Sequence, residues 1–152
     1  MSNKAKTLEV LQAVITGIEA QSLTHRYESK IFGAAGFSKL AEKYADHAAE
    51  EKDFADKFID RLLDLGGELK QNGAEAKPLT DDIEEFLKYD RKVSEDGLKV
   101  VNDIMASGDL DVTTYELFVE YLADEEEDLY WSEEQLDLIK LIGKQNYLVK
   151  ML

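Results

Sequence analysis

The sequence predicts an all-α protein, a four-helix bundle with one long crossover connection. Three observations predict it: the 152 residues include only one proline, 44% of them are apolar, and the apolar side chains recur at alternating steps of three and four. This spacing places apolar side chains on one face of an α-helix. A chain of this length can bury one core, so we expect a single domain over residues 1–152.

The first two helices are expected to be joined by a short turn. The first covers about residues 6–32 and the second about residues 38–65, both with inward-facing apolar positions at the helical period. Gly66 and Gly67 follow the second helix, and glycine tolerates the left-handed backbone that closes many helices. These two helices therefore form an antiparallel pair.

The other two helices are expected after the crossover. The polar stretch 68–77 is the expected crossover, and Thr80 is the expected N-cap of a third helix that runs to about residue 107. The fourth helix is expected from about residue 114 to just before Gly143. Two short connections and one long one are typical of bundles with a single crossover.

Charge and composition exclude several classes of function. The chain has 33 acidic and 18 basic residues, and its formal net charge of −15 opposes contact with nucleic acid or anionic membrane surfaces. Without cysteine it has no disulfide and no thiolate chemistry. No apolar stretch approaches the ~18 residues that span a bilayer. Because the first residues lead into an amphipathic helix rather than an apolar signal core, we expect a cytoplasmic protein.

Polar side chains occupy inward positions at one level of the predicted bundle. A purely structural bundle would place Leu or Ile there, because an unpaired buried carboxylate is costly. The set is Ser22, His25, His47, Glu51, Ser94, Glu125 and Asp128. Glu125 and Asp128 share one helix face and could converge with Glu51 on a cation. The alternatives are that the acidic groups face solvent and that both histidines are hydrogen-bonded side chains rather than ligands.

The C-terminal third carries the most specific pattern. Residues 124–131 (Asp-Glu-Glu-Glu-Asp-Leu-Tyr-Trp), 135–139 (Gln-Leu-Asp-Leu-Ile) and 142–148 (Ile-Gly-Lys-Gln-Asn-Tyr-Leu) resemble the bacterioferritin family. The resemblance continues through residues 55–63 and covers nearly the whole chain. It implies a ferritin-like bundle with a short fifth helix near residues 146–152. It also implies two-fold dimers that assemble into a hollow shell of 24 subunits.

The resemblance also implies a pattern of iron ligands. Bacterioferritins hold two irons with a Glu on the first and third helices and Glu-x-x-His on the second and fourth. Glu51 and Glu125 stand at two of these six positions in this sequence. The other four positions hold Ile18, Phe54, Ser94 and Asp128. We therefore do not expect an ordinary ferroxidase reaction, and the sequence leaves open whether the protein is an enzyme.

Two further positions depart from the family. Bacterioferritins bind haem through a Met directly after the second-helix Glu, and Lys52 stands there, so haem is not expected. His25 takes the place of a Tyr beside the metal site. One hypothesis is a rearranged single-metal site of Glu51, Glu125, Asp128 and His25. The alternative is that these groups are a hydrogen-bonded remnant.

Other acidic side chains are expected at the cavity of the implied shell. In the family, Asp46, His47 and Glu50 lie around the part of the second helix that faces it, where weak carboxylate sites can collect iron. Three functions are therefore open: a cage subunit that binds and stores iron, a ferritin-fold structural or binding protein, and a protein with one mononuclear metal. Iron or another divalent metal is the expected ligand. A storage subunit could use an altered site or co-assemble with a catalytic subunit.

Overall fold

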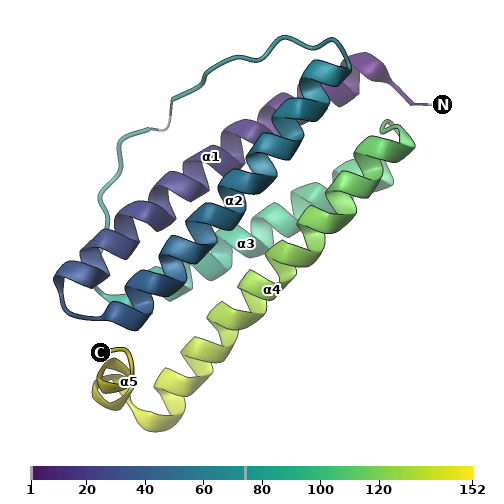
Figure 1. The fold of residues 1–152 in the computed structure, drawn as a ribbon. Coiled ribbons are helices and arrows are strands. Elements are labelled where there is room, and N and C mark those ends of the chain that lie inside the picture. Colours follow the sequence, from purple (N-terminus) through teal and green to yellow (C-terminus); the bar gives the residue numbers. More distant parts are fainter. Residues whose placement is uncertain (1, 74) are drawn as a thin grey trace.

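A computed structural model describes residues 2–73 and 75–152, and within them the fold is entirely helical. Ala74, inside the expected crossover, lies outside the described residues. The helices are α1 (Lys4–Ala34), α2 (Ser38–Asp64), α3 (Ile83–Ala106), α4 (Val112–Ile142) and α5 (Lys144–Lys150). The predicted all-α bundle with a short C-terminal fifth helix is confirmed (Figure 1).

The four long helices form two pairs, α1 with α2 and α3 with α4 (Figure 1). The crossover runs back along the outside of the first pair, so α2 and α3 are parallel. At one end of the bundle, the amide of Asn3 donates to the carbonyl of Asp109 at 2.7 Å. At the other end, the amide of Lys39 donates to the carbonyl of Met151 at 3.1 Å. These bonds fasten the start of α1 and the last residues of the chain to the bundle.

Aspartates cap α3 and α4. Oδ1 of Asp82 accepts a hydrogen bond from the amide of Glu85 at 3.1 Å, and Oδ1 of Asp111 accepts one from the amide of Thr114 at 3.0 Å. The carboxylate also suits the positive end of the helix dipole. The expected cap at Thr80 is wrong, because α3 begins after Asp82. The hydroxyl of Thr80 instead donates to Oε2 of Glu85 in the first turn of α3 and accepts a hydrogen bond from the amide of Asp82.

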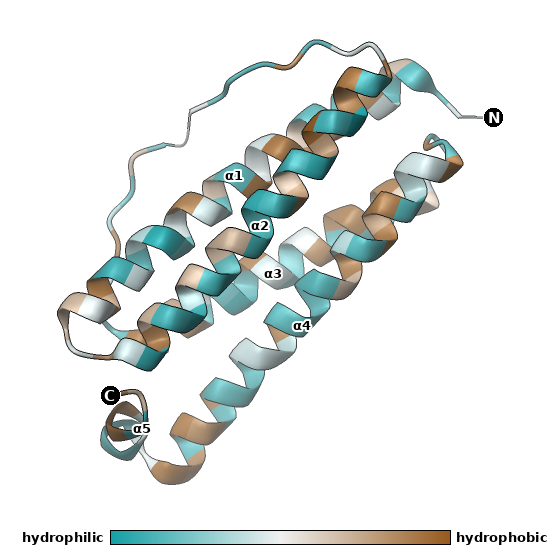
Figure 2. Ribbon diagram, in the orientation of Figure 1, coloured by the Kyte–Doolittle hydropathy of each residue, from teal (hydrophilic) through white to brown (hydrophobic). Residues whose placement is uncertain are grey.

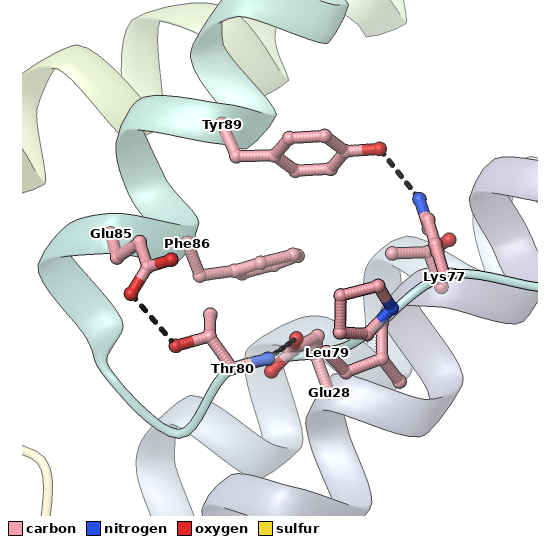
Figure 3. Close-up of a pocket in the computed structure, with 9 residues that line it drawn as sticks. Glu28, Lys77, Leu79, Thr80, Glu85, Phe86 and Tyr89 are labelled. Atoms are coloured by element: carbon pink, nitrogen blue, oxygen red, sulfur yellow. Dashed lines mark hydrogen bonds between the residues drawn. The ribbon is translucent and has the colours of Figure 1, made fainter.

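The crossover is anchored near its end on both α1 and α3. The amide of Thr80 donates to Oε1 of the buried Glu28 at 3.1 Å. Nζ of Lys77 donates to the hydroxyl of Tyr89 at 2.5 Å (Figure 3). Burial raises the pKa of Glu28, and the hydrogen bond from the backbone amide of Thr80 counteracts part of that rise. The pocket between the crossover, α1 and α3 is therefore lined by side chains whose contacts position the connection (Figure 3).

The core consists of two apolar clusters separated by polar side chains. One cluster comprises Leu11, Ile15, Ile18, Ala55, Phe58, Leu62, Val101, Phe118 and Tyr121. The other comprises Phe32, Leu40, Tyr44, Ile83, Phe86, Leu87, Ile139 and Tyr147. Between them lies a group that we call the polar belt: His25, His47, Glu51, Asp90, Ser94, Glu125 and Ser132, all buried, with Asp128 at its edge. Figure 2 shows α4 hydrophobic toward both ends and hydrophilic along its middle.

Candidate metal centre

His25 on α1 contacts carboxylates from two other helices. Its Nδ1 contacts Oε1 of Glu51 on α2, and its Nε2 lies 2.8 Å from Oδ1 of Asp90 on α3. All three side chains are buried. Burial by itself lowers the pKa of a histidine, but Asp90 and Glu51 outweigh it and hold the pKa of His25 well above its usual value. An imidazolium donates from both nitrogens, so His25 is a cation paired with two acceptors.

The other belt carboxylates have no such partner. Burial, followed by the charge of Glu51, raises the pKa of Glu125 to about 8. Burial, followed by the charge of Glu125, raises the pKa of Asp128 to about 8. A carboxyl with a raised pKa is stabilised by taking up a proton or by contact with a cation. Positive charge on this side of the belt would therefore stabilise the ionised forms of Glu125 and Asp128, and His25 does not supply enough of it.

His47 on α2 differs from His25 in almost every respect. It is 1% exposed, and neither ring nitrogen has a hydrogen-bond partner among the described residues. Its Nε2 lies 3.4 Å from Oδ1 of Asp128 without the geometry of a hydrogen bond. Burial, followed by the charge of His25, lowers the pKa of His47 to about 3. The ring is therefore neutral at pH 7 and keeps a lone pair that can bind a metal.

The described parts of the chain contain two groups of three side chains whose potential ligand atoms, within each group, all lie within 4.8 Å of one another. The buried group is His25, His47 and Asp90, and the more open group is Glu50, Asp124 and Asp128. Within the first group, both nitrogens of His25 already contact carboxylates. The second group has one exposed side chain, on α2, and two half-buried ones, on α4.

The structure places the predicted site residues at one level but not in one cluster. His25 contacts Glu51, whereas Asp128 lies 3.4 Å from Nε2 of His47 and has a carboxylate oxygen within 4.8 Å of one on Glu50. Glu125 is buried beside them. The single-metal arrangement of Glu51, Glu125, Asp128 and His25 stays a prediction. It would require His25 to give up one of its carboxylate contacts.

Two acidic residues of this region, Asp90 and Asp124, were not predicted as site residues. Asp90 occupies an inward position of α3, and a charged residue on an apolar stripe is a signal that could have identified it. Asp124 lies four residues before Asp128 and therefore on the same helix face. Its position in an acidic run is typical of a solvated surface, so its signal is weaker.

A bundle of four long helices with one crossover, a short fifth helix, and carboxylates and imidazoles gathered at its centre defines a ferritin-like protein. The profile of the family described as "Ferritin-like domain" matches residues 19–142. The chain is similar to "Bacterial ferritin" of Neisseria meningitidis serogroup B, with 32% identity, and to that of Pseudomonas aeruginosa, with 30%. Each alignment covers 97% of both chains. It is also similar to "Bacterioferritin" of Brucella melitensis, with 31% identity over 74% of this chain and 71% of that protein.

The chain belongs to the ferritin-like family, in its bacterial ferritin and bacterioferritin branch. The resemblance drawn from the sequence is therefore confirmed. This is a family of iron-storage proteins that bind iron and form oligomeric cages. None of the described helices combines the length and apolarity needed to cross a membrane.

The residues present do not fit the di-iron centre that the family implies. Ile18 and Ser94 are buried and offer neither a carboxylate nor an imidazole, and Phe54 is a half-buried hydrocarbon ring. Of the family ligands that remain, Glu51 already contacts His25. Two irons need about four carboxylates and two imidazoles, which this level of the bundle does not supply in that arrangement.

Proposed function

We propose that the chain is a storage subunit of an iron-binding cage that lacks a di-iron ferroxidase centre of its own. The observation that carries this proposal is the position of His25. At the level where the family holds its metal, an imidazolium joins Glu51 and Asp90, and four of the six ligand types are replaced. A positive side chain at this level repels metal cations and competes with them for the same carboxylates.

Iron in this proposal is cargo. The net charge of −15 attracts cations, and Asp46 and Glu50 are exposed on α2, where the resemblance places the cavity. Carboxylate oxygens bind ferrous and ferric iron, and many weak sites are enough to hold growing mineral. Iron would be oxidised by a co-assembled bacterioferritin subunit that retains the ligands. The same resemblance supports two-fold dimers and a shell of 24 subunits.

The proposed cage does not bind haem through paired methionines. Lys52 is exposed and lines a groove on the α1–α2 face together with Arg26 and Lys30. An ammonium group offers no lone pair to iron while it is protonated. The groove therefore lacks the thioether that the family pattern requires.

A structural or binding role is the second candidate, and one observation favours it. The contacts of His25 with Glu51 and Asp90 neutralise part of the negative charge of the belt, so less of that charge remains for a metal to balance. In this alternative the protein still assembles into a cage but no longer stores iron.

Bulk iron content separates the two candidates. Ferrous iron is added in air at neutral pH to the protein alone and to the protein co-assembled with a catalytic bacterioferritin. Iron per subunit is then measured in the shell-sized peak from size exclusion. Storage predicts slow loading alone and, after co-assembly, iron far above the roughly two per subunit of a di-iron site. A shell-sized peak with little iron under both conditions supports the structural role, and rapid oxidation by the protein alone contradicts the loss of the centre.

A further inference from the structure

A pocket with a volume of about 160 Å³ lies between the end of the crossover, α1 and α3 (Figure 3). The aromatic rings of Phe86 and Tyr89 line it from α3, and the side chains of Pro78 and Leu79 line it from the crossover. A cavity of about 150 Å³ holds a molecule the size of benzene. The pocket therefore has room for one small organic molecule.

Glu28 of α1 brings a carboxylate with one unpaired oxygen to this pocket. Its side chain is 1% exposed, and its Oε1 accepts a hydrogen bond from the amide of Thr80 at 3.1 Å. Its Oε2 is buried and has no hydrogen-bond partner among the residues that the structure describes. Buried polar atoms are nearly always paired, so this oxygen would be stabilised by a donor from outside the described chain.

The pocket already attracts one ammonium group to its rim. Nζ of Lys77 donates to the hydroxyl of Tyr89 at 2.5 Å and lies 4.7 Å from the centroid of that ring. Aromatic rings and carboxylates both attract cations. Lys77 therefore shows which charge the pocket favours, although its ammonium contacts Tyr89 and leaves Oε2 of Glu28 unpaired.

We propose that this pocket binds one small organic cation, in which an ammonium or amidinium group is attached to an apolar group. The cationic group donates to Oε2 of Glu28, and the apolar group packs against the rings of Phe86 and Tyr89. A metal ion suits the pocket less well, because it needs several oxygen or nitrogen ligands and these walls are mainly apolar. The site goes beyond the proposed storage function, because it involves neither iron nor the polar belt.

Benzylammonium and benzyl alcohol test the site, because they have nearly the same shape and differ in charge. Each is titrated at neutral pH and constant ionic strength into the metal-free, assembled protein, and saturation transfer from protein to ligand is measured by proton NMR. The Kd of benzylammonium should be lower than that of benzyl alcohol by about tenfold or more, because hydrogen bonds to charged groups are the stronger ones. This comparison uses the wild-type protein, so it does not depend on whether a variant folds.

Glu28→Gln should remove the preference for the cation. Its amide oxygen can still accept the hydrogen bond from Thr80, so the connection keeps this anchor. Glu19→Gln is the matched control, because Glu19 is an exposed residue of the same helix, carries the same charge and lies outside this pocket. The control should leave the Kd of benzylammonium almost unchanged.

Lys77 provides a test in the opposite direction. A fixed ammonium group at the rim repels a second cation, so Lys77→Gln should lower the Kd of benzylammonium by about threefold or more. Lys77→Arg keeps the charge and should give no such gain. A Kd that is unchanged or higher in Lys77→Gln would contradict binding beside Lys77.

Three other results would overturn the site: no saturable binding of benzylammonium, equal binding of the alcohol and the ammonium ion, or a preference for the cation that persists in Glu28→Gln. Equal losses in Glu28→Gln and Glu19→Gln would also overturn it, because they would attribute the preference to the net charge of the protein. Iron loading does not enter this experiment. The storage proposal and the cation site can therefore fail independently of each other.

Discussion

Nε2 of His25 lies 2.8 Å from Oδ1 of Asp90, a residue 65 positions further along the chain. Through its second ring nitrogen, which contacts Glu51, the same imidazolium joins three helices at the middle of the bundle. In the family pattern, a metal supplies the positive charge at this level. Here the His25 imidazolium supplies part of that charge through its contacts with Glu51 and Asp90.

Removal of one charge from this arrangement should destabilise the bundle. Asp90→Asn leaves the buried imidazolium with one carboxylate fewer, and a broken buried ion pair costs about 3 kcal/mol or more. The measurement is denaturant unfolding of the assembled protein at neutral pH. Asp96→Asn is the control, because the pair of Asp96 with Lys92 is exposed and should contribute little. Equal losses in the two variants would contradict a special role for His25.

The metal-free protein should become less stable as the pH rises above neutrality. The pKa of Glu125 is about 8 in the fold against 4.5 in an unfolded chain, so its protonation favours the fold, and this contribution is lost as the pH rises through about 8. The raised pKa of His25 acts in the same direction above pH 6.5. His47 acts in the opposite direction, but its lowered pKa affects stability only below pH 6.5.

Thermal unfolding in the presence of a chelator checks this dependence. The Tm should fall between pH 6.5 and about pH 9, and Glu125→Gln should reduce the slope, because an amide does not ionise. A Tm that stays constant or rises across this range would refute the assignment of protons to the belt.

Two glycines offer a direct test of packing outside the belt. A Cβ on Gly67 would lie 2.8 Å from Cδ2 of Leu8 and 2.9 Å from the backbone oxygen of Leu62. Because that oxygen also accepts a hydrogen bond from the amide of Gly67 at 2.9 Å, it cannot move away freely. Gly67→Ala should therefore lose about 1–3 kcal/mol of stability.

The opposite outcome is expected at Gly97 within α3, where an added Cβ meets no neighbour within 4 Å. Gly97→Ala should gain about 0.5–1 kcal/mol, because alanine loses less backbone entropy in a helix. Denaturant unfolding of both variants gives the sign directly. A gain at Gly67 would show that the turn after α2 relaxes more easily than its contacts indicate.

Helical periodicity predicted the architecture and the level of the polar belt well. Inward positions recur every 3.6 residues, so the period alone assigns His47, Glu51 and Glu125 to the interior. Helix starts were less predictable. Thr80 and Asp82 are both good N-caps, and only the contacts of the crossover with α1 decide between them.

Pairing within the belt could not be predicted in the same way. Contact between His25 and Asp90 depends on the rotation and axial position of α1 relative to α3, and no local pattern encodes either quantity. The direction of His47 toward Asp128 depends likewise on the packing of α2 against α4. Sequence therefore identifies the groups present at the centre of the bundle, whereas tertiary packing decides which of them meet.

Restoring the family's ligands should restore iron oxidation only if His25 is also replaced. The combined variant carries Ile18→Glu, Phe54→His, Ser94→Glu, Asp128→His and His25→Tyr. With the imidazolium removed, Glu51 is free to bind metal, and the six ligand types of the family are present at their positions. We expect aerobic oxidation of ferrous iron, followed by absorbance, to be faster than in the wild type by on the order of tenfold or more.

The control is the same variant with His25 retained. In it Glu51 keeps its contact with the imidazolium, and the positive charge opposes two incoming irons, so oxidation should stay close to the wild-type rate. Circular dichroism and size exclusion confirm that both variants fold and assemble before rates are compared. If the control oxidises iron as fast as the combined variant, His25 does not block the centre, and the four replaced ligands alone account for its loss.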